Sequence, residues 1–171
     1  MPIAAADDRA SFELTTTSTG NMGAQLAEQA GSILSDARTT LLFLSGEQAN
    51  NDFPLALFPA VPSRRPIADA TRLTVFNAIG NVDRVDLYLL EEGDTIADTQ
   101  PRLGNAIPSR LFEQTTIATG TFDAVITNAA DDTVLYGPMP ITLSPGDVSV
   151  LILSETADPN VADLIRFELA P

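Results

Sequence analysis

The sequence has no cysteine, histidine, lysine or tryptophan, so all nine of its basic residues are arginine. Without cysteine there can be no disulfide bond and no thiolate metal site. Without histidine or cysteine, Ser-His-Asp and Cys-His catalysis, the usual zinc sites and iron–sulfur clusters are excluded. Without lysine, Schiff-base chemistry and the phosphate-binding lysine of P-loops are excluded as well.

The composition does not exclude enzymes that use only carboxylates for catalysis, namely glycosidases with two acids and aspartic proteases with paired aspartates. The Asp-Thr-Gly and Asp-Ser-Gly signatures of aspartic proteases do not occur, and no pair among the twenty-three acidic residues stands out as a glycosidase pair. We therefore expect a protein that is not an enzyme and that binds no cofactor.

Acidic residues outnumber the arginines, and the formal net charge is −14. Nucleic acids and anionic membrane surfaces require a basic face, so we expect neither as a partner. Residues 1–8 have neither the basic start nor the apolar run of a signal peptide, and no stretch approaches the ~20 apolar residues of a spanning helix. We expect no membrane insertion, and if the protein is exported, its signal lies outside this numbering.

Short runs of apolar and β-branched residues, separated by turn-forming residues, are typical of β-strands. Apolar residues make up 44% of the chain, which is enough for a core. The pattern predicts an all-β protein with almost no helix. The ten predicted strands are 11–17, 39–45, 54–58, 72–77, 84–90, 110–117, 121–128, 133–136, 147–154 and 163–169.

An internal repeat is the most informative feature of the sequence. The segment 41–45, Leu-Leu-Phe-Leu-Ser, matches 150–154, Val-Leu-Ile-Leu-Ser, at an offset of 109 residues, and one residue of slippage aligns Phe12 with Phe122. The repeat also decides the structure expected for residues 22–38, whose Ala-Gln-Leu-Ala-Glu-Gln-Ala stretch favours a helix by local propensity. Its counterpart contains two prolines, so we expect strand or irregular structure at 22–38 instead.

The repeat divides the chain into two parts. Residues 59–69, rich in proline, are typical of a stiff, extended linker. Residues 70–171 form a complete second repeat of some seven strands, the size and strand number of an immunoglobulin-like sandwich. Residues 1–58 form an incomplete first repeat, because two opening strands of the second repeat have no counterpart there. The expected fold is a tandem of immunoglobulin-like β-sandwiches, the first of which lacks its opening strands.

A half sandwich leaves an apolar face and a strand edge open. Three interpretations are open: a fragment of a longer chain, a fold that shares strands between its halves, or a subunit completed by strands from a neighbour. The last would join chains head to tail into fibres. Another copy of the protein is therefore an expected partner, through the open strand edges of the first repeat.

Motifs of the second repeat resemble a known family. Arg-Leu-Thr-Val-Phe-Asn-Ala at 72–78 is followed by Val-Asp-Leu-Tyr at 85–88, Ala-Thr-Gly-Thr-Phe at 118–122 and Leu-Ser-Pro-Gly at 143–146. Their order and spacing resemble the bacterial domain of unknown function numbered four-three-nine-seven. The resemblance implies tandem immunoglobulin-like sandwiches on exported or cell-surface proteins, often lipoproteins, without enzymatic activity and without agreed ligand residues.

Six residues are expected to have structural roles: Asn77, Asp86, Tyr88, Gly120, Phe122 and Gly146. Asp86 is expected at a strand start, where its oxygens meet backbone groups or Asn77. The two glycines are expected in the turns that precede the strands at 121–128 and 147–154.

Acidic residues also cluster in predicted loops, and calcium prefers oxygen ligands. The weak candidates for calcium are Asp131, Asp132, Glu91 and Asp94. None has the Asp-x-Asp-x-Asp-Gly spacing of a calcium loop, and aspartate is common in turns for local reasons, so no metal site is assigned.

These observations predict a non-catalytic structural or adhesive β-sandwich module, located at the cell surface or outside the cell. Other surface proteins or polysaccharide are expected classes of partner. Two alternatives are a self-assembling fibre subunit, completed by strand exchange between neighbouring chains, and a calcium-dependent ligand-binding module.

Overall fold

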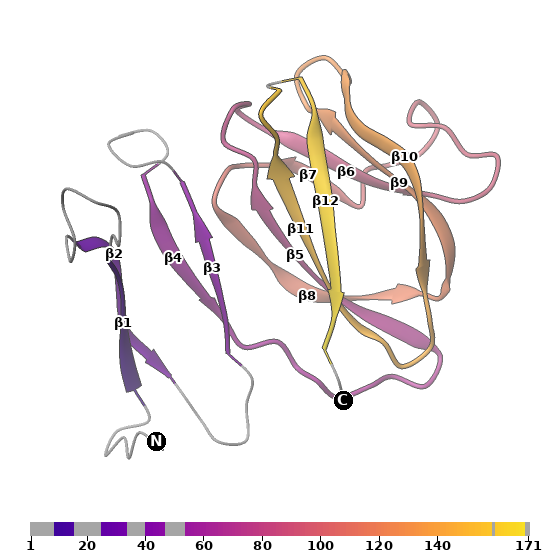
Figure 1. Cartoon of the computed structure of the whole chain (residues 1–171). Coiled ribbons are helices and arrows are strands. Elements are labelled where there is room, and N and C mark those ends of the chain that lie inside the picture. The colour runs from indigo at the N-terminus through magenta and orange to yellow at the C-terminus, as the bar shows by residue number, and fades with distance from the viewer. Residues whose placement is uncertain (1–8, 16–24, 34–39, 47–53, 159, 170–171) are drawn as a thin grey trace. The chain divides into compact units, whose positions relative to one another are not determined.

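The computed structural model describes residues 9–15, 25–33, 40–46, 54–158 and 160–169 (Figure 1). These residues form twelve strands and no helix, which confirms the all-β prediction. Accordingly, the described part of the chain contains no helix that could cross a membrane. The chain divides into unit 1, Met1–Pro62, and unit 2, Ser63–Pro171, and this boundary lies inside the predicted linker 59–69.

Unit 2 is a sandwich of two four-stranded sheets. One sheet has the order β10-β9-β6-β7 and the other β12-β11-β5-β8. Strands β5 and β11 pair in parallel, and all other neighbours in the two sheets pair antiparallel. The strands are β5 (Ala70–Ala78), β6 (Val85–Leu90), β7 (Leu103–Ala106), β8 (Arg110–Ala118), β9 (Gly120–Asn128), β10 (Val134–Leu143), β11 (Val148–Glu155) and β12 (Ala162–Glu168).

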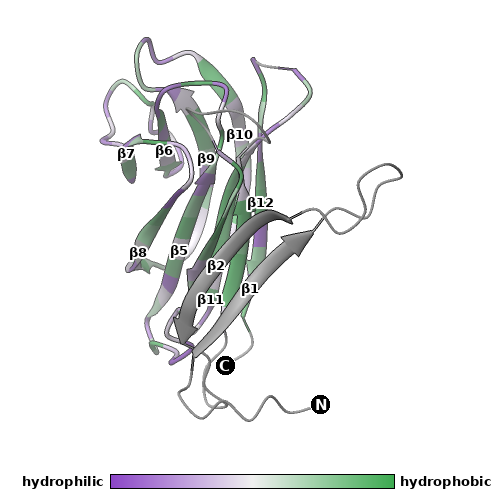
Figure 2. Ribbon diagram, turned by 90° about the vertical axis from the view of Figure 1, so that its left-hand side faces the viewer, coloured by the Kyte–Doolittle hydropathy of each residue, from purple (hydrophilic) through white to green (hydrophobic). Residues whose placement is uncertain are grey.

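The core of unit 2 lies between the sheets, and apolar segments recur along the strands of both (Figure 2). Along β6, Val85 and Leu87 are fully buried in this core. Tyr88 and Leu90, which belong to the opposite face, form a second small cluster with Val125. This is the period-two alternation that is general for β-strands. The outer cluster is also packed against Ile96, so the long β6–β7 loop covers that face.

The structure extends or adds strands where the sequence signal was weak. Strand β7 was not predicted, so unit 2 has eight strands rather than some seven. The strand predicted at 133–136 continues to Leu143 as β10, past Pro138 and Pro140. Proline is tolerated there because β10 is the edge strand of its sheet and its register shifts between Tyr136 and Met139.

Unit 1 consists of two antiparallel strand pairs. Strand β1 (Arg9–Thr15) pairs with β2 (Gln25–Ile33), and β3 (Leu41–Ser45) pairs with β4 (Ala56–Ala60). Strand β2 lies where local propensity favours a helix, and it agrees with the strand or irregular structure that the repeat predicts for 22–38. Residues 22–24 and 34–38 of that segment lie outside the described residues. Strand β4 begins and ends two residues later than predicted and includes the first two residues of the expected linker.

The strand pairs of unit 1 correspond to the last four strands of unit 2. The offset of 109 or 110 residues places β1 on β9, β2 on β10 and β3 on β11. The last strand is displaced, because Phe43 pairs with Phe58 whereas Ile152 pairs with Ile165. At the offset of 109, Phe43 corresponds to Ile152 and Phe58 to Phe167, so the pairing in unit 1 is shifted by two residues relative to the pair Ile152 and Ile165. A shift of two residues preserves which side chains share a face, so the alternation of the repeat survives it.

Candidate interaction surface

Two polar residues of unit 2 hold the short strand β7 in place. Asn77 is fully buried, and its Nδ2 donates to the carbonyl oxygens of Ala106 at 3.1 Å and Ile107 at 3.0 Å. Its Oδ1 accepts from the Ile79 amide at 3.0 Å. Asp86, 8% exposed, accepts from the amide of Asn105 at 2.6 Å. As expected, Asp86 lies near the start of β6 and one of its oxygens binds a backbone group. That group belongs to Asn105 of β7, and not to Asn77.

The remaining residues expected to be structural lie in strands and turns. Phe122 is 7% exposed and belongs to the core between the sheets. Gly146, with φ of +83°, lies in the turn before β11, where the Asp147 amide donates to the Ser144 carbonyl at 3.2 Å. Gly120 was expected in a turn, but it is the first residue of β9 and pairs with Leu143.

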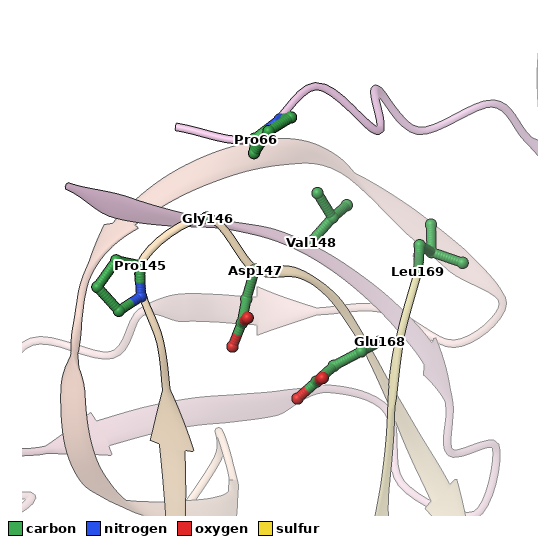
Figure 3. A pocket seen from close by; sticks show the side chains of 7 residues that line it. All are labelled: Pro66, Pro145, Gly146, Asp147, Val148, Glu168 and Leu169. Carbon is green, nitrogen blue, oxygen red and sulfur yellow. The ribbon is translucent and has the colours of Figure 1, made fainter. Parts of the chain in front are cut away.

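The chain enters and leaves unit 2 at the same end of the sandwich, which we call the proximal end. Because β5 and β11 are parallel and β12 runs antiparallel to β11, the start of β5 and the end of β12 lie together. A pocket of 520 Å³ forms at this end (Figure 3). It is lined by residues of the entering segment, the β10–β11 turn and the departing strand: Pro66, Pro145, Gly146, Asp147, Val148, Glu168 and Leu169.

The two carboxylates of this pocket are already bound by other groups. Arg166 Nη2 lies 2.7 Å from Glu168 Oε1 and 3.5 Å from Asp147 Oδ2. Asp147 Oδ2 also accepts from the Ser144 amide at 2.9 Å. These contacts of Asp147 and Glu168 therefore stabilise the junction between the β10–β11 turn and strand β12.

Arginines join the two sheets along both open sides of the sandwich. On one side, Arg166 of β12 donates to the carbonyl oxygen of Thr142 in β10. On the other, Arg102 Nη2 donates to Thr115 Oγ1 at 2.9 Å and to the Thr116 carbonyl at 3.1 Å, both in β8. Arg102 also borders a 300 Å³ cleft whose lining includes core residues of β5. Sequence reasoning missed both arginines, since neither belongs to a motif.

The end opposite the proximal end consists of four loops, which we call the distal loops: residues 79–84, 107–109, 129–133 and 156–161, of which residue 159 is not described. Hydrogen bonds connect two of them to each other and one of them to the end of β11. The Ala129 amide donates to the Arg84 carbonyl at 3.1 Å, and the Gly80 amide donates to Glu155 Oε2, at the end of β11, at 3.1 Å. The loops 79–84 and 129–133 are therefore held together rather than forming independent hairpin tips.

The distal loops are acidic and partly apolar. They carry four aspartates against one arginine. Ile107 and Val161, in two of these loops, are 41% and 44% exposed. Binding residues are common on loops that a rigid scaffold holds, so the distal loops are the part of unit 2 best placed for contact with another macromolecule.

The calcium candidates do not converge. Asp131 and Asp132 belong to the distal loops, whereas Glu91 and Asp94 follow the opposite end of β6. Asp131 Oδ1 accepts from the Thr133 amide at 3.0 Å, which is a local turn contact. Within the described residues, no three acidic side chains are grouped so that they could hold a metal ion.

Both tyrosines have perturbed acidity. Burial, followed by the negative charges of Asp86 and Asp132, raises the pKa of Tyr88 above its usual value of 10.0. Burial, followed by the charge of Asp163, raises the pKa of Tyr136 in the same direction. Both phenols therefore stay neutral at physiological pH, which suits packing rather than proton transfer.

Comparisons with known proteins yield no relative. No family model matches the chain, and no significant match was found among curated proteins or solved structures.

Proposed function

We propose that this protein is a non-catalytic β-sandwich module of the bacterial cell surface, with a structural or adhesive role, in which the distal loops of unit 2 carry the contact with a partner. One observation carries the proposal: the chain enters and leaves unit 2 at the proximal end. A module attached at one end presents its opposite end outward, and binding residues concentrate on loops held by a rigid scaffold.

The bonding of the polar side chains supports a role without chemistry. Asn77 and Asp86 fasten β7, Arg102 and Arg166 join the sheets, and Asp147 holds a turn. A catalytic group needs a side chain that is free to meet a substrate. The resemblance to the bacterial domain of unknown function numbered four-three-nine-seven agrees with such a role, and export to the surface is part of this proposal.

The location is tested on intact producing cells. An antibody against the protein is expected to label cells that have not been permeabilised. Labelling that appears only after lysis would overturn the surface assignment.

The adhesive role is tested by charge substitutions on matched loops. The distal double variant is Asp131→Asn/Asp132→Asn, and the control is Glu91→Gln/Glu92→Gln, which removes the same charge from exposed residues of another loop. We expect several-fold fewer attached cells for the distal variant and wild-type attachment for the control, counted on a polysaccharide-coated surface. Equal attachment of both variants would refute a role of the distal loops in adhesion.

A further inference from the structure

A cleft of 300 Å³ opens on the side of unit 2 that is bounded by the edge strands β7 and β8. The described residues that line it are Leu73, Val75, Arg102, Leu103, Phe112 and Thr115. Leu73 and Val75 are buried members of the core between the sheets, so the cleft reaches that core. Its volume lies at the small end of the range of ligand pockets, about 300–1,000 Å³.

Irregular pairing of both edge strands accounts for this cleft. Leu73 of β5 pairs with Thr115 of β8, and Val75, two residues further on, pairs with Phe112. Two residues of β8 therefore lie opposite the single residue Thr74, which is a β-bulge. Strand β7 has four residues against nine in β8, and its pairing with β6 is also irregular, so β7 is too short to cover the length of β8. Bulges are common next to functional sites, because they redirect side chains.

The polar groups of the cleft are hydrogen-bond donors. Arg102 Nη2 donates to Thr115 Oγ1 at 2.9 Å and to the Thr116 carbonyl oxygen at 3.1 Å. Among the described residues, no hydrogen bond involves Nε or Nη1 of Arg102, so these N–H groups can donate to a ligand. The Thr115 hydroxyl accepts from Arg102, and its own proton is a further donor. A charged donor group of this kind selects an anionic acceptor, and a carboxylate has the single negative charge that one guanidinium matches.

The charge of the cleft contrasts with the charge of the whole chain, which is −14. The pocket at the proximal end has two carboxylates in its lining, Asp147 and Glu168. No acidic residue is among the described residues that line the cleft, which has Arg102 instead. A second arginine, Arg110, lies over the ring of Phe112, with Cζ 5.6 Å from the ring centroid. The cleft is therefore a local positive site, which favours an anion over a cation.

We propose that this cleft binds a small amphipathic carboxylate, whose short apolar tail occupies the cleft and whose carboxylate accepts from Arg102 and Thr115. Burial of the tail against the apolar lining supplies the driving force, and the guanidinium fixes the orientation of the ligand. Arg102 keeps its bonds to β8 while it binds the ligand through its other N–H groups. No described residue of the lining belongs to the distal loops, so this site is separate from the surface proposed for adhesion.

The test is a titration of the full chain, followed by NMR of labelled leucine and valine methyl groups, with hexanoate as the probe. Hexanoate is expected to shift the methyl signals of Leu73, Val75 and Leu103, with one common saturation in the millimolar range. The methyl signals of Val148 are expected to stay unchanged, because Val148 lines the pocket with the two carboxylates. Hexan-1-ol has the same tail without the charge and is expected to bind at least about tenfold more weakly.

Two variants and a matched control test the two parts of the site. Arg102→Gln removes the guanidinium and is expected to weaken hexanoate binding at least about tenfold. The control, Arg84→Gln, removes the same charge from an exposed residue of the distal loops and is expected to keep the wild-type affinity. Because Arg102 also joins the two sheets, Leu103→Phe is a second variant that keeps Arg102 and fills the cleft. It is expected to abolish binding while the dispersed methyl signals show that the core stays folded.

Four outcomes would each overturn the inference. The first is a wild type without saturable shifts, and the second is hexan-1-ol that binds as tightly as hexanoate. The third is equal affinity of the Arg102→Gln and Arg84→Gln variants, and the fourth is undiminished binding by Leu103→Phe. Shifts of Val148 with the same affinity as those of Leu73 would indicate non-specific uptake and would contradict the inference as well.

Discussion

Replacement of Asn77 with alanine tests whether buried polar contacts hold the β7 side of unit 2. The substitution removes three hydrogen bonds, two to the carbonyls of Ala106 and Ile107 and one from the Ile79 amide. A net contribution of about 1 kcal/mol for each bond gives about 3 kcal/mol. Asn77 is fully buried, so the backbone groups left unpaired add desolvation costs, and the expected total loss is about 3–5 kcal/mol.

The assay is urea denaturation followed by tyrosine fluorescence. The chain has no tryptophan, and both of its tyrosines, Tyr88 and Tyr136, belong to unit 2, so the signal reports that unit alone. The control is Asn128→Ala, which removes one solvent-exposed bond, donated by the Ala130 amide to Asn128 Oδ1, and is expected to cost less than about 1 kcal/mol. A loss for Asn77→Ala no larger than that of the control would refute the reasoning.

Three further predictions concern backbone strain, pH and salt. Gly137→Ala is expected to lower the free energy of unfolding by at least about 2 kcal/mol more than Gly93→Ala. Both glycines have positive φ, but a Cβ at Gly137 would lie 2.1 Å from the Ala124 carbonyl oxygen, whereas Gly93 has open space. Because the folded-state pKa values of Tyr88 and Tyr136 are raised, the folded protein keeps protons that the unfolded chain releases near pH 10. The urea midpoint should therefore fall as the pH rises past 10. Spectroscopic titration should show that the phenols ionise at higher pH in the folded protein than in the unfolded chain. Finally, the net charge of −14 predicts that added sodium chloride raises the thermal midpoint, and a flat dependence would indicate local compensation by the arginines.

Strand β6 and strand β2 illustrate what a sequence pattern can predict. In β6, the alternation of side chains in a strand puts Val85 and Leu87 on the face opposite Tyr88 and Leu90, and the structure places these pairs in two different clusters. In β2, local propensity favoured a helix, but the repeat carried information from a distant segment and predicted strand or irregular structure. Tertiary context commonly overrides local propensity, and a repeat makes that context visible in the sequence.

Strand β7 and the two arginine contacts illustrate what the pattern could not predict. The sequence of β7, Leu-Gly-Asn-Ala, has no β-branched residue and contains a glycine, so it lacks strand propensity. It pairs with β6, and its backbone is bound by the side chains of Asn77 in β5 and Asp86 in β6. Arg102 likewise donates to a backbone carbonyl, and a carbonyl has no signature in the sequence. Contacts of this kind depend on the assembled fold.

The absence of lysine bears directly on the edges of the sheets. Lysine is a common protecting residue on edge strands, and this chain has none. In unit 2 the edges have other protection, since Arg102 is bound to β8, Arg166 joins β12 to β10, and β10 contains two prolines. In unit 1, β3 has neither a charged residue nor a proline. In unit 2, arginine and proline therefore take the protective role that lysine commonly has on edge strands.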